Sequence, residues 1–186
     1  MDFYGFYTGK EFEAYRFLGA HACEKGTVFR TFAPNAQRIS LIGEFNGWQE
    51  TPMQKVHDGN FWECYGANAQ KGMMYKYKIY GADGSCIDHC DPYGFYAELR
   101  PNSASIIYDT TNYHFTDGEW MKKRSIHREA PLNIYEVHFG SWRKKVNDDP
   151  EGWYTYREMA DLLIPYLNEN GYNYVELMPL SEHPCD

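Results

Sequence analysis

Hydrophobic and polar positions alternate in short runs between residues 27 and 108. Turn-forming pairs such as Asn46-Gly47 and Asp83-Gly84 separate these runs at close spacing. The clearest run alternates two sets of residues that would face opposite sides of a strand: Tyr75, Tyr77 and Ile79 against Lys76, Lys78 and Tyr80. About seven such runs without a helical period predict an antiparallel β-sandwich of the immunoglobulin-like type, and therefore a mainly β fold.

The segments on either side of these runs have a different character. Residues 1–20 mix aromatic and charged residues, and the spacing of the aromatic positions near the start predicts a short amphipathic helix. We expect this lead segment to pack on the sandwich, which we assign to residues 21–112. Residues 113–131 are polar, lack the strand period and end at Pro131, which predicts a linker.

After residue 131 the pattern becomes strand, helix, strand. Residues 133–139 and 174–178 predict the strands, and Thr155 with Glu158 forms a capping box that opens the helix between them. A crossover of this length predicts that the two strands are parallel. One such unit cannot cover both faces of a parallel sheet. We therefore expect residues 132–186 to be the truncated start of a (β/α)8 barrel, which takes about 250 residues.

Composition and charge limit the possible partners. The net charge of −8 argues against nucleic acid, because nucleic-acid binding needs clustered cations and the short cluster at residues 122–128 predicts only a solvated face. No run approaches the roughly 20 apolar residues of a membrane span, and residues 1–10 lack the pattern of a signal peptide. We therefore expect no membrane partner, a cytoplasmic location and reduced cysteines.

Cys86, His89 and Cys90 are residue types that bind zinc, and they lie close together in the sequence. Their spacing is not that of a common zinc site, and no second pair follows. The sequence therefore predicts neither a metal nor a cofactor.

Several phrases spread along the chain resemble bacterial glycogen branching enzymes of the α-amylase superfamily, glycoside hydrolase family 13. The phrases FAPNAQRISLIGEFNGW and MYKYKIYGADG are similar to the family-48 carbohydrate-binding module that precedes the barrel in those enzymes. The phrases PLNIYEVHFGSWRKK and ELMPLSEHP resemble their first and second barrel strands. The resemblance implies an α-glucan as substrate and the remainder of a catalytic barrel as a partner.

The same resemblance implies that the parent forms α-1,6 branches by double displacement with an Asp nucleophile, a Glu acid/base and a second Asp. Those acids belong to later barrel strands, so this chain is expected to hold no catalytic residue and to be inactive alone. Glu182 and His183, near the end of the second strand, are interpreted as loop-shaping residues. Two other hypotheses remain open: a stand-alone, non-catalytic glycogen-binding module, and the front end of a debranching or trehalose-forming relative.

Two residues match sugar-binding positions of the related modules. Trp48 matches a stacking tryptophan, and Lys76 matches a hydrogen-bonding lysine. Where a second tryptophan is expected the chain has Ser85-Cys86, and near an expected asparagine it has Ser103 and Ser105. Half of the stacking platform is therefore predicted to be missing. We favour a structural role for the sandwich over weak glucan binding. We assign four other aromatic residues to packing in the core or between domains: Trp62, Tyr65, Tyr75 and Tyr77.

Overall fold

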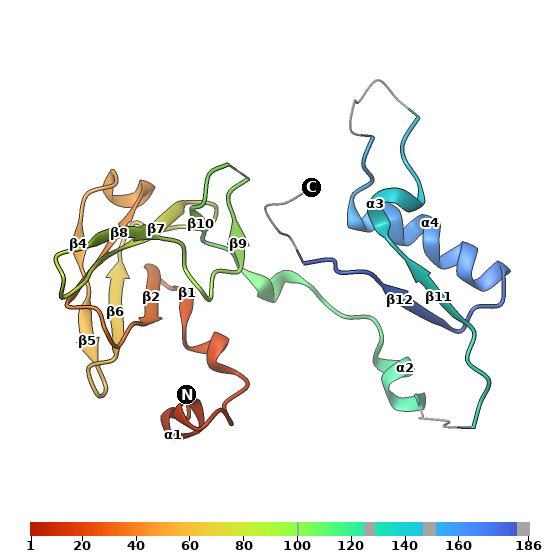
Figure 1. Cartoon of the computed structure of the whole chain (residues 1–186), viewed down its shortest axis with the longest axis horizontal. Coiled ribbons are helices and arrows are strands. Elements are labelled where there is room, and N and C mark those ends of the chain that lie inside the picture. Colours follow the sequence, from red (N-terminus) through yellow and green to blue (C-terminus); the bar gives the residue numbers. More distant parts are fainter. Residues whose placement is uncertain (100, 125–128, 147–151, 182–186) are drawn as a thin grey trace. The chain divides into compact units, whose positions relative to one another are not determined.

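The computed structural model describes residues 1–99, 101–124, 129–146 and 152–181. The chain divides into two compact units, Met1–Phe115 and Thr116–Asp186, and each is described by itself (Figure 1). Glu182 and His183, interpreted above as loop-shaping residues, lie outside the described residues.

The first unit contains two antiparallel sheets. A four-stranded sheet has the order β1-β2-β6-β5. The other sheet has the order β4-β3-β7-β10-β9, and β8 also pairs with β7. The strands have these bounds: β1 Gly19–Cys23, β2 Gly26–Phe32, β3 Arg38–Gly43, β4 Thr51–Pro52, β5 Gln54–Val56, β6 Phe61–Gly66, β7 Met74–Tyr80, β8 Cys86–His89, β9 Tyr96–Ala97 and β10 Ser105–Ile106. The predicted β-sandwich is confirmed.

Alternation along the strands explains where the core lies. On β7, Tyr75 and Tyr77 are almost fully buried, with 0% and 1% of their surface exposed, whereas Lys76 between them points to the other face. Phe29 of β2 and Leu41 of β3 are also fully buried. Together they form one apolar cluster drawn from both sheets, so the period-two pattern of the sequence corresponds to the inner faces of the sandwich.

A buried carboxylate ties part of this core together. The Asp91 Oδ2 atom accepts hydrogen bonds from the hydroxyls of Tyr75 at 2.7 Å and Tyr77 at 3.0 Å. The Asp91 Oδ1 atom accepts one from the backbone N–H of Tyr93 at 2.8 Å. Desolvation raises the pKa of Asp91, and the three donors oppose that rise. The network satisfies two tyrosine hydroxyls that would otherwise be unpaired inside the core.

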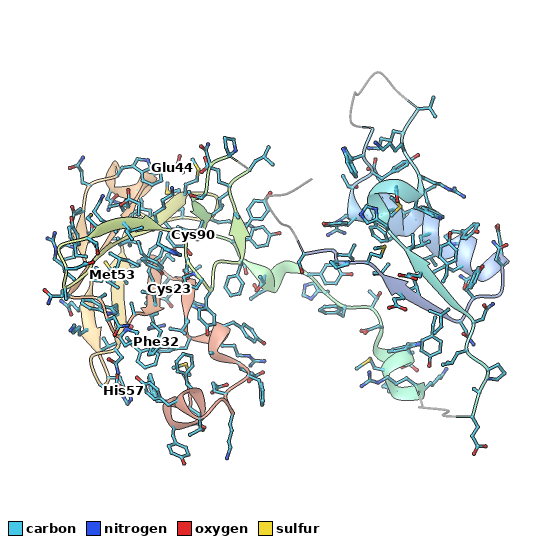
Figure 2. The ribbon with its side chains drawn as sticks, in the orientation of Figure 1. Cys23, Phe32, Glu44, Met53, His57 and Cys90 are labelled. Atoms are coloured by element: carbon cyan, nitrogen blue, oxygen red, sulfur yellow. The ribbon has the colours of Figure 1, made fainter. Side chains whose placement is uncertain are left out.

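The lead segment forms a layer of its own against the four-stranded sheet. It contains α1 (Phe3–Tyr7) and the 3-10 helix η1 (Ala14–Arg16). The Phe3 and Phe6 rings pack on Phe61 of β6 with centroid distances of 5.0 and 5.4 Å. Phe3 also stacks on His57, and Phe6 contacts Phe32; His57 and Phe32 are labelled in Figure 2. The predicted short helix, and its packing on the sandwich, are confirmed.

This layer explains one wrong expectation. Trp62 is buried as predicted and its indole N–H donates to the Ala33 carbonyl at 3.0 Å, but Tyr65 is 48% exposed. Phe61 and Tyr65 lie on the same face of β6, away from the core. The lead segment covers Phe61, whereas Tyr65 is not among the described residues that pack against it.

The segment between the two β-rich parts contains short helical turns that the sequence pattern did not predict. These are η3 (Thr110–Asn112) and α2 (Gly118–Lys123). The Asp109 carboxylate accepts a hydrogen bond from the Thr111 N–H and so caps η3. A helical turn of this length is too short to leave a hydrophobic period in the sequence.

The second unit is the predicted strand-helix-strand arrangement. Strand β11 (Ile134–Val137) pairs in parallel with β12 (Tyr174–Leu177), and the helices α3 (Phe139–Trp142) and α4 (Tyr156–Glu169) lie between them in the sequence. The Thr155–Glu158 capping box opens α4, and Gly171 follows the C-cap with a φ of 72°. Helix α4 continues through Pro165.

The small parallel sheet leaves apolar side chains exposed. Ile134, Val175 and Leu177 are 40–48% exposed, as expected for a barrel start. Val137, at the end of the same small sheet, is only 4% exposed. Val137 is the last residue of β11, and α3 begins two positions later at Phe139. No helix in the described part of the chain is both long and apolar enough to cross a membrane.

Candidate functional site

The candidate surface is built on the turn that joins β3 to β4. This turn contains the 3-10 helix η2 (Glu44–Asn46), and the Asn46 side chain holds it in place. The Asn46 Oδ1 atom accepts from the Gly43 N–H at 2.9 Å, and Nδ2 donates to the Leu41 carbonyl at 3.1 Å and the Thr51 hydroxyl at 3.0 Å. One amide side chain thus fixes both ends of the turn.

Trp48 follows in an unusual backbone conformation. Gly47 and Trp48 have φ values of 62° and 61°, in the left-handed region that disfavours residues with a Cβ. The Trp48 N–H donates to the Gly43 carbonyl at 2.8 Å, which keeps the backbone there. The Trp48 side chain is 42% exposed. The chain therefore holds a large ring at the surface at some cost in backbone strain.

Lys76 lies close to the same end of β3. It is directly opposite Ile42 in the β3–β7 ladder, and its ammonium donates to the Ser103 hydroxyl at 3.2 Å. Both sequence-predicted residues thus adjoin the Ile42–Gly43 end of β3, although the described contacts join neither side chain directly to the other. Ser105, the other serine considered, is buried and its hydroxyl accepts from the Asp91 N–H, so its role is structural.

Sequence reasoning missed Glu44, which the structure places on this surface. Its carboxylate accepts from the Met74 N–H at 2.8 Å and so connects the turn to β7; it is labelled in Figure 2. Glu44 is exposed. Its partner, the Met74 N–H, lies 30 positions away in the sequence, so no local pattern indicates this contact.

Further along the same sheet, polar side chains cover the place where a second aromatic platform is absent. Cys86 pairs with Tyr80 across β7 and β8. The Arg38 guanidinium lies 3.8 Å from the centroid of the Tyr80 ring, and the Tyr80 hydroxyl donates to Glu50 at 2.6 Å. That bond lowers the pKa of Glu50 and raises the pKa of Tyr80 to about 12. One face of the Tyr80 ring is therefore occupied by a cation.

Comparison with known proteins shows which families the chain resembles. Residues 17–94 match carbohydrate-binding module 48, the isoamylase N-terminal domain. All of the chain aligns with the 1,4-alpha-glucan branching enzyme GlgB of Bacillus caldolyticus at 44% identity, covering 29% of that protein. The GlgB of Halothermothrix orenii is 43% identical over all of the chain and 30% of its own length.

A solved structure is similar to most of the chain as well. A putative alpha amylase from Salmonella typhimurium superposes with a TM-score of 0.64 at 26% identity, over 89% of this chain and 25% of that one. The chain thus spans about 30% of the length of the curated relatives it matches. Residues 17–94 are similar to carbohydrate-binding module 48, and along its whole length the chain is similar to part of the GlgB branching enzymes.

Proposed function

We propose that the protein to which this chain belongs is a 1,4-α-glucan branching enzyme, and that the chain supplies its carbohydrate-binding module and the first strands of its barrel. The observation that carries this proposal is a similarity of 43–44% identity that covers all of the chain and therefore both units. A module shared with other glucan enzymes would account for residues 17–94 alone.

In this function the catalytic acids come from parts of the barrel that the chain does not contain. A retaining transfer needs one carboxylate to attack the sugar and another to act as acid and base. In barrels of this type the reacting groups gather at the C-terminal ends of the strands, which here follow Val137 and Leu177. These two strand ends would contribute to the rim of the site.

Product analysis tests this part of the proposal. The complete protein, incubated with amylose, is expected to yield glucan with new α-1,6 linkages, detected by proton NMR of the anomeric region. The purified 186-residue chain is expected to yield none. Release of free sugars without new branches by the complete protein would contradict the proposal and favour a debranching or trehalose-forming activity.

Within the module, we place α-glucan on the surface formed by Trp48 and Lys76. A tryptophan ring held half-exposed by a strained backbone offers a flat apolar face for a sugar ring. The Lys76 ammonium has three donors, of which the Ser103 hydroxyl takes one. Arg38 covers one face of Tyr80, so we expect Trp48 to be the main stacking ring and binding to be weak.

Affinity electrophoresis in gels containing glycogen tests this surface. The chain is expected to be retarded, and Trp48→Ala is expected to lose most of the retardation, since a stacking ring contributes about 1–3 kcal/mol to comparable interactions. Trp120→Ala is the matched control, because Trp120 is 62% exposed and belongs to the other unit.

The competing role is purely structural, and the engagement of Lys76 by Ser103 and of Tyr80 by Arg38 favours it. In that case the module orients the barrel and holds no sugar. Equal migration of the chain, Trp48→Ala and Trp120→Ala at every glycogen concentration would support the structural role and contradict glucan binding at Trp48.

A further inference from the structure

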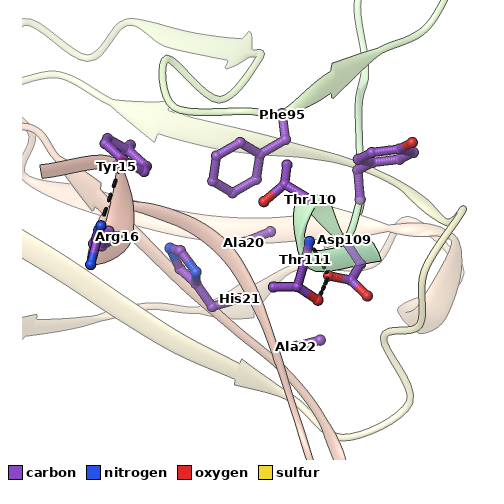
Figure 3. Close-up of a pocket in the computed structure, with 10 residues that line it drawn as sticks. Tyr15, Arg16, Ala20, His21, Ala22, Phe95, Asp109, Thr110 and Thr111 are labelled. Atoms are coloured by element: carbon purple, nitrogen blue, oxygen red, sulfur yellow. Dashed lines mark hydrogen bonds between the residues drawn. The ribbon is translucent and has the colours of Figure 1, made fainter. Parts of the chain in front are cut away.

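A hollow of about 630 Å³ lies in the first unit, apart from the Trp48 surface. Its volume is within the range of small-ligand sites. Figure 3 shows its walls, which come from η1, β1 and the segments before β9 and after β10. Its aromatic and charged lining residues include Tyr15, Arg16, His21, Phe95, Tyr108 and Asp109. Strand β1 is the outermost strand of the four-stranded sheet, whereas Trp48 follows β3 of the other sheet.

The hollow has aromatic walls. The Tyr15 and Tyr108 side chains are each 44% exposed, and Phe95 meets the His21 ring edge-on at a centroid distance of 5.9 Å. A tyrosine ring combines a flat apolar face with a polar edge. Each tyrosine has a cation near its ring, Arg16 at 5.9 Å from the Tyr15 centroid and Lys71 at 5.2 Å from the Tyr108 centroid. The exposed parts of the two rings suit a flat ligand with both apolar faces and hydroxyl groups.

His21 adds a hydrogen-bond acceptor with a defined orientation. Its Nε2 atom lies 2.9 Å from the Leu18 carbonyl oxygen. Because a carbonyl oxygen only accepts, Nε2 carries a proton in this bond, and Nδ1 is an acceptor whenever the ring is neutral. The ring extends into the hollow in Figure 3.

Charged groups of both signs complete the rim. The Arg16 guanidinium pairs with Glu13 at 2.8 Å and has further N–H donors. The Asp109 Oδ1 atom accepts from the N–H and the hydroxyl of Thr111 at 2.9 and 2.6 Å, which fixes the carboxylate. A cation and an anion at one rim give no preference for a charged ligand, but both bind hydroxyl groups well.

The backbone of β1 contributes as well. Three successive residues, Ala20, His21 and Ala22, line the hollow. Successive side chains of a strand point to opposite faces, so the hollow must lie along the edge of β1 rather than over one face. The open edge of a sheet presents unpaired N–H and C=O groups, which are further partners for hydroxyls.

We propose that this hollow is a second α-glucan site of the module, which takes a short, neutral α-1,4-linked segment. The sugar class rests on the proposed function, whereas the place and the residues rest on the hollow itself. The sugar rings stack on Tyr15 and Tyr108, a hydroxyl donates to His21 Nδ1, and Arg16 and Asp109 bind hydroxyls at the rim.

Titration of the 186-residue chain with maltoheptaose, followed by NMR of the ¹⁵N-labelled protein, tests the proposal. The expected result is saturable shifts at two separate groups of signals: the Trp48 indole, and the His21 ring nitrogens together with the Thr110 and Thr111 amides. Tyr15→Ala with Tyr108→Ala is expected to weaken binding at the second group at least about fivefold. The same substitutions should leave the Trp48 shifts unchanged.

A matched control separates a local effect from a general one. Tyr65→Ala removes a ring that is 48% exposed on β6, and it is expected to change neither group. Shifts at Trp48 alone would refute the second site and leave glucan binding at Trp48 intact. Shifts at the hollow alone would refute glucan binding at Trp48 and leave the second site intact, and no shifts at either place would refute both sites; none of these outcomes bears on the branching activity, which product analysis tests separately.

Discussion

Replacement of Asp91 by alanine should destabilise the sandwich, because the Asp91 carboxylate is the shared acceptor for two core tyrosines. The Tyr75 and Tyr77 side chains are 0% and 1% exposed, and both hydroxyls donate to Asp91 Oδ2. In Asp91→Ala both hydroxyls remain buried without that acceptor.

The size of the effect follows from this count. Each buried hydroxyl left unsatisfied costs about 1–3 kcal/mol. Removal of a carboxylate that is itself desolvated returns part of that energy, which is consistent with the raised pKa of Asp91. We therefore expect a net loss of about 2–4 kcal/mol in the free energy of unfolding of the first unit. Because the folded pKa is raised, the carboxylate's own contribution is most favourable at low pH and declines as pH rises through that pKa.

Urea unfolding measures this loss if the reporter belongs to the sandwich alone. The indole N–H of Trp62, bonded to the Ala33 carbonyl, gives such a signal by NMR and avoids interference from the second unit. The same Asp91→Ala change in a chain that also carries Tyr75→Phe and Tyr77→Phe should cost much less, because no hydroxyl is then stranded. Equal costs in the two backgrounds, or a cost below about 0.5 kcal/mol in the first, would refute this reasoning.

Two further predictions concern the lead segment and the capping box. Phe61→Ala should lower the free energy of unfolding by about 3–5 kcal/mol, because Phe61 is fully buried under the lead segment; Tyr65→Ala on the same strand should stay within about 0.5 kcal/mol of the parent, and similar losses for both would contradict the layered packing. The Lys145 ammonium, 2.9 Å away, and Thr155 lower the pKa of Glu158 to about 2. Its contribution is therefore present above the ordinary carboxyl pKa and lost as pH falls through about 2. Carbon-detected titration should show a midpoint near 2 that moves upward in Lys145→Met, and an unchanged midpoint would exclude Lys145 as the main cause.

The sequence was informative where the physical cause is local. The alternation along β7 and the Thr155–Glu158 capping box are properties of residues two or three positions apart, and the structure confirms both. It failed for Tyr65 because burial there depends on a layer supplied by residues near position 6, about 60 positions earlier. The sequence predicted only part of the backbone conformation around Trp48. The Asn46-Gly47 pair indicated a turn, but no pattern indicated the φ of 61° at Trp48.

The hollow around His21 could not have been predicted from any motif. Its polar and aromatic residues come from segments near positions 15, 21, 95 and 109. None of these segments has a local sequence pattern that indicates a binding site. Only the pairing of β1 with β2, and of β10 with β9, sets their places in the two sheets. Sites of this kind depend on topology, which spacing along the chain does not encode.

The division of the sandwich surface explains where binding chemistry can lie. The lead segment uses the outer face of the four-stranded sheet, since Phe3 and Phe6 cover Phe61. The hollow lies at the edge of this sheet, along β1. The other sheet keeps Lys76 of β7 on its outer face, and its β3–β4 turn holds Trp48 at the surface. A glucan chain long enough to reach both places would bind with an affinity that exceeds either site alone, because the second contact becomes intramolecular. Affinity for glycogen should therefore fall more steeply when both places are altered than the two single changes suggest.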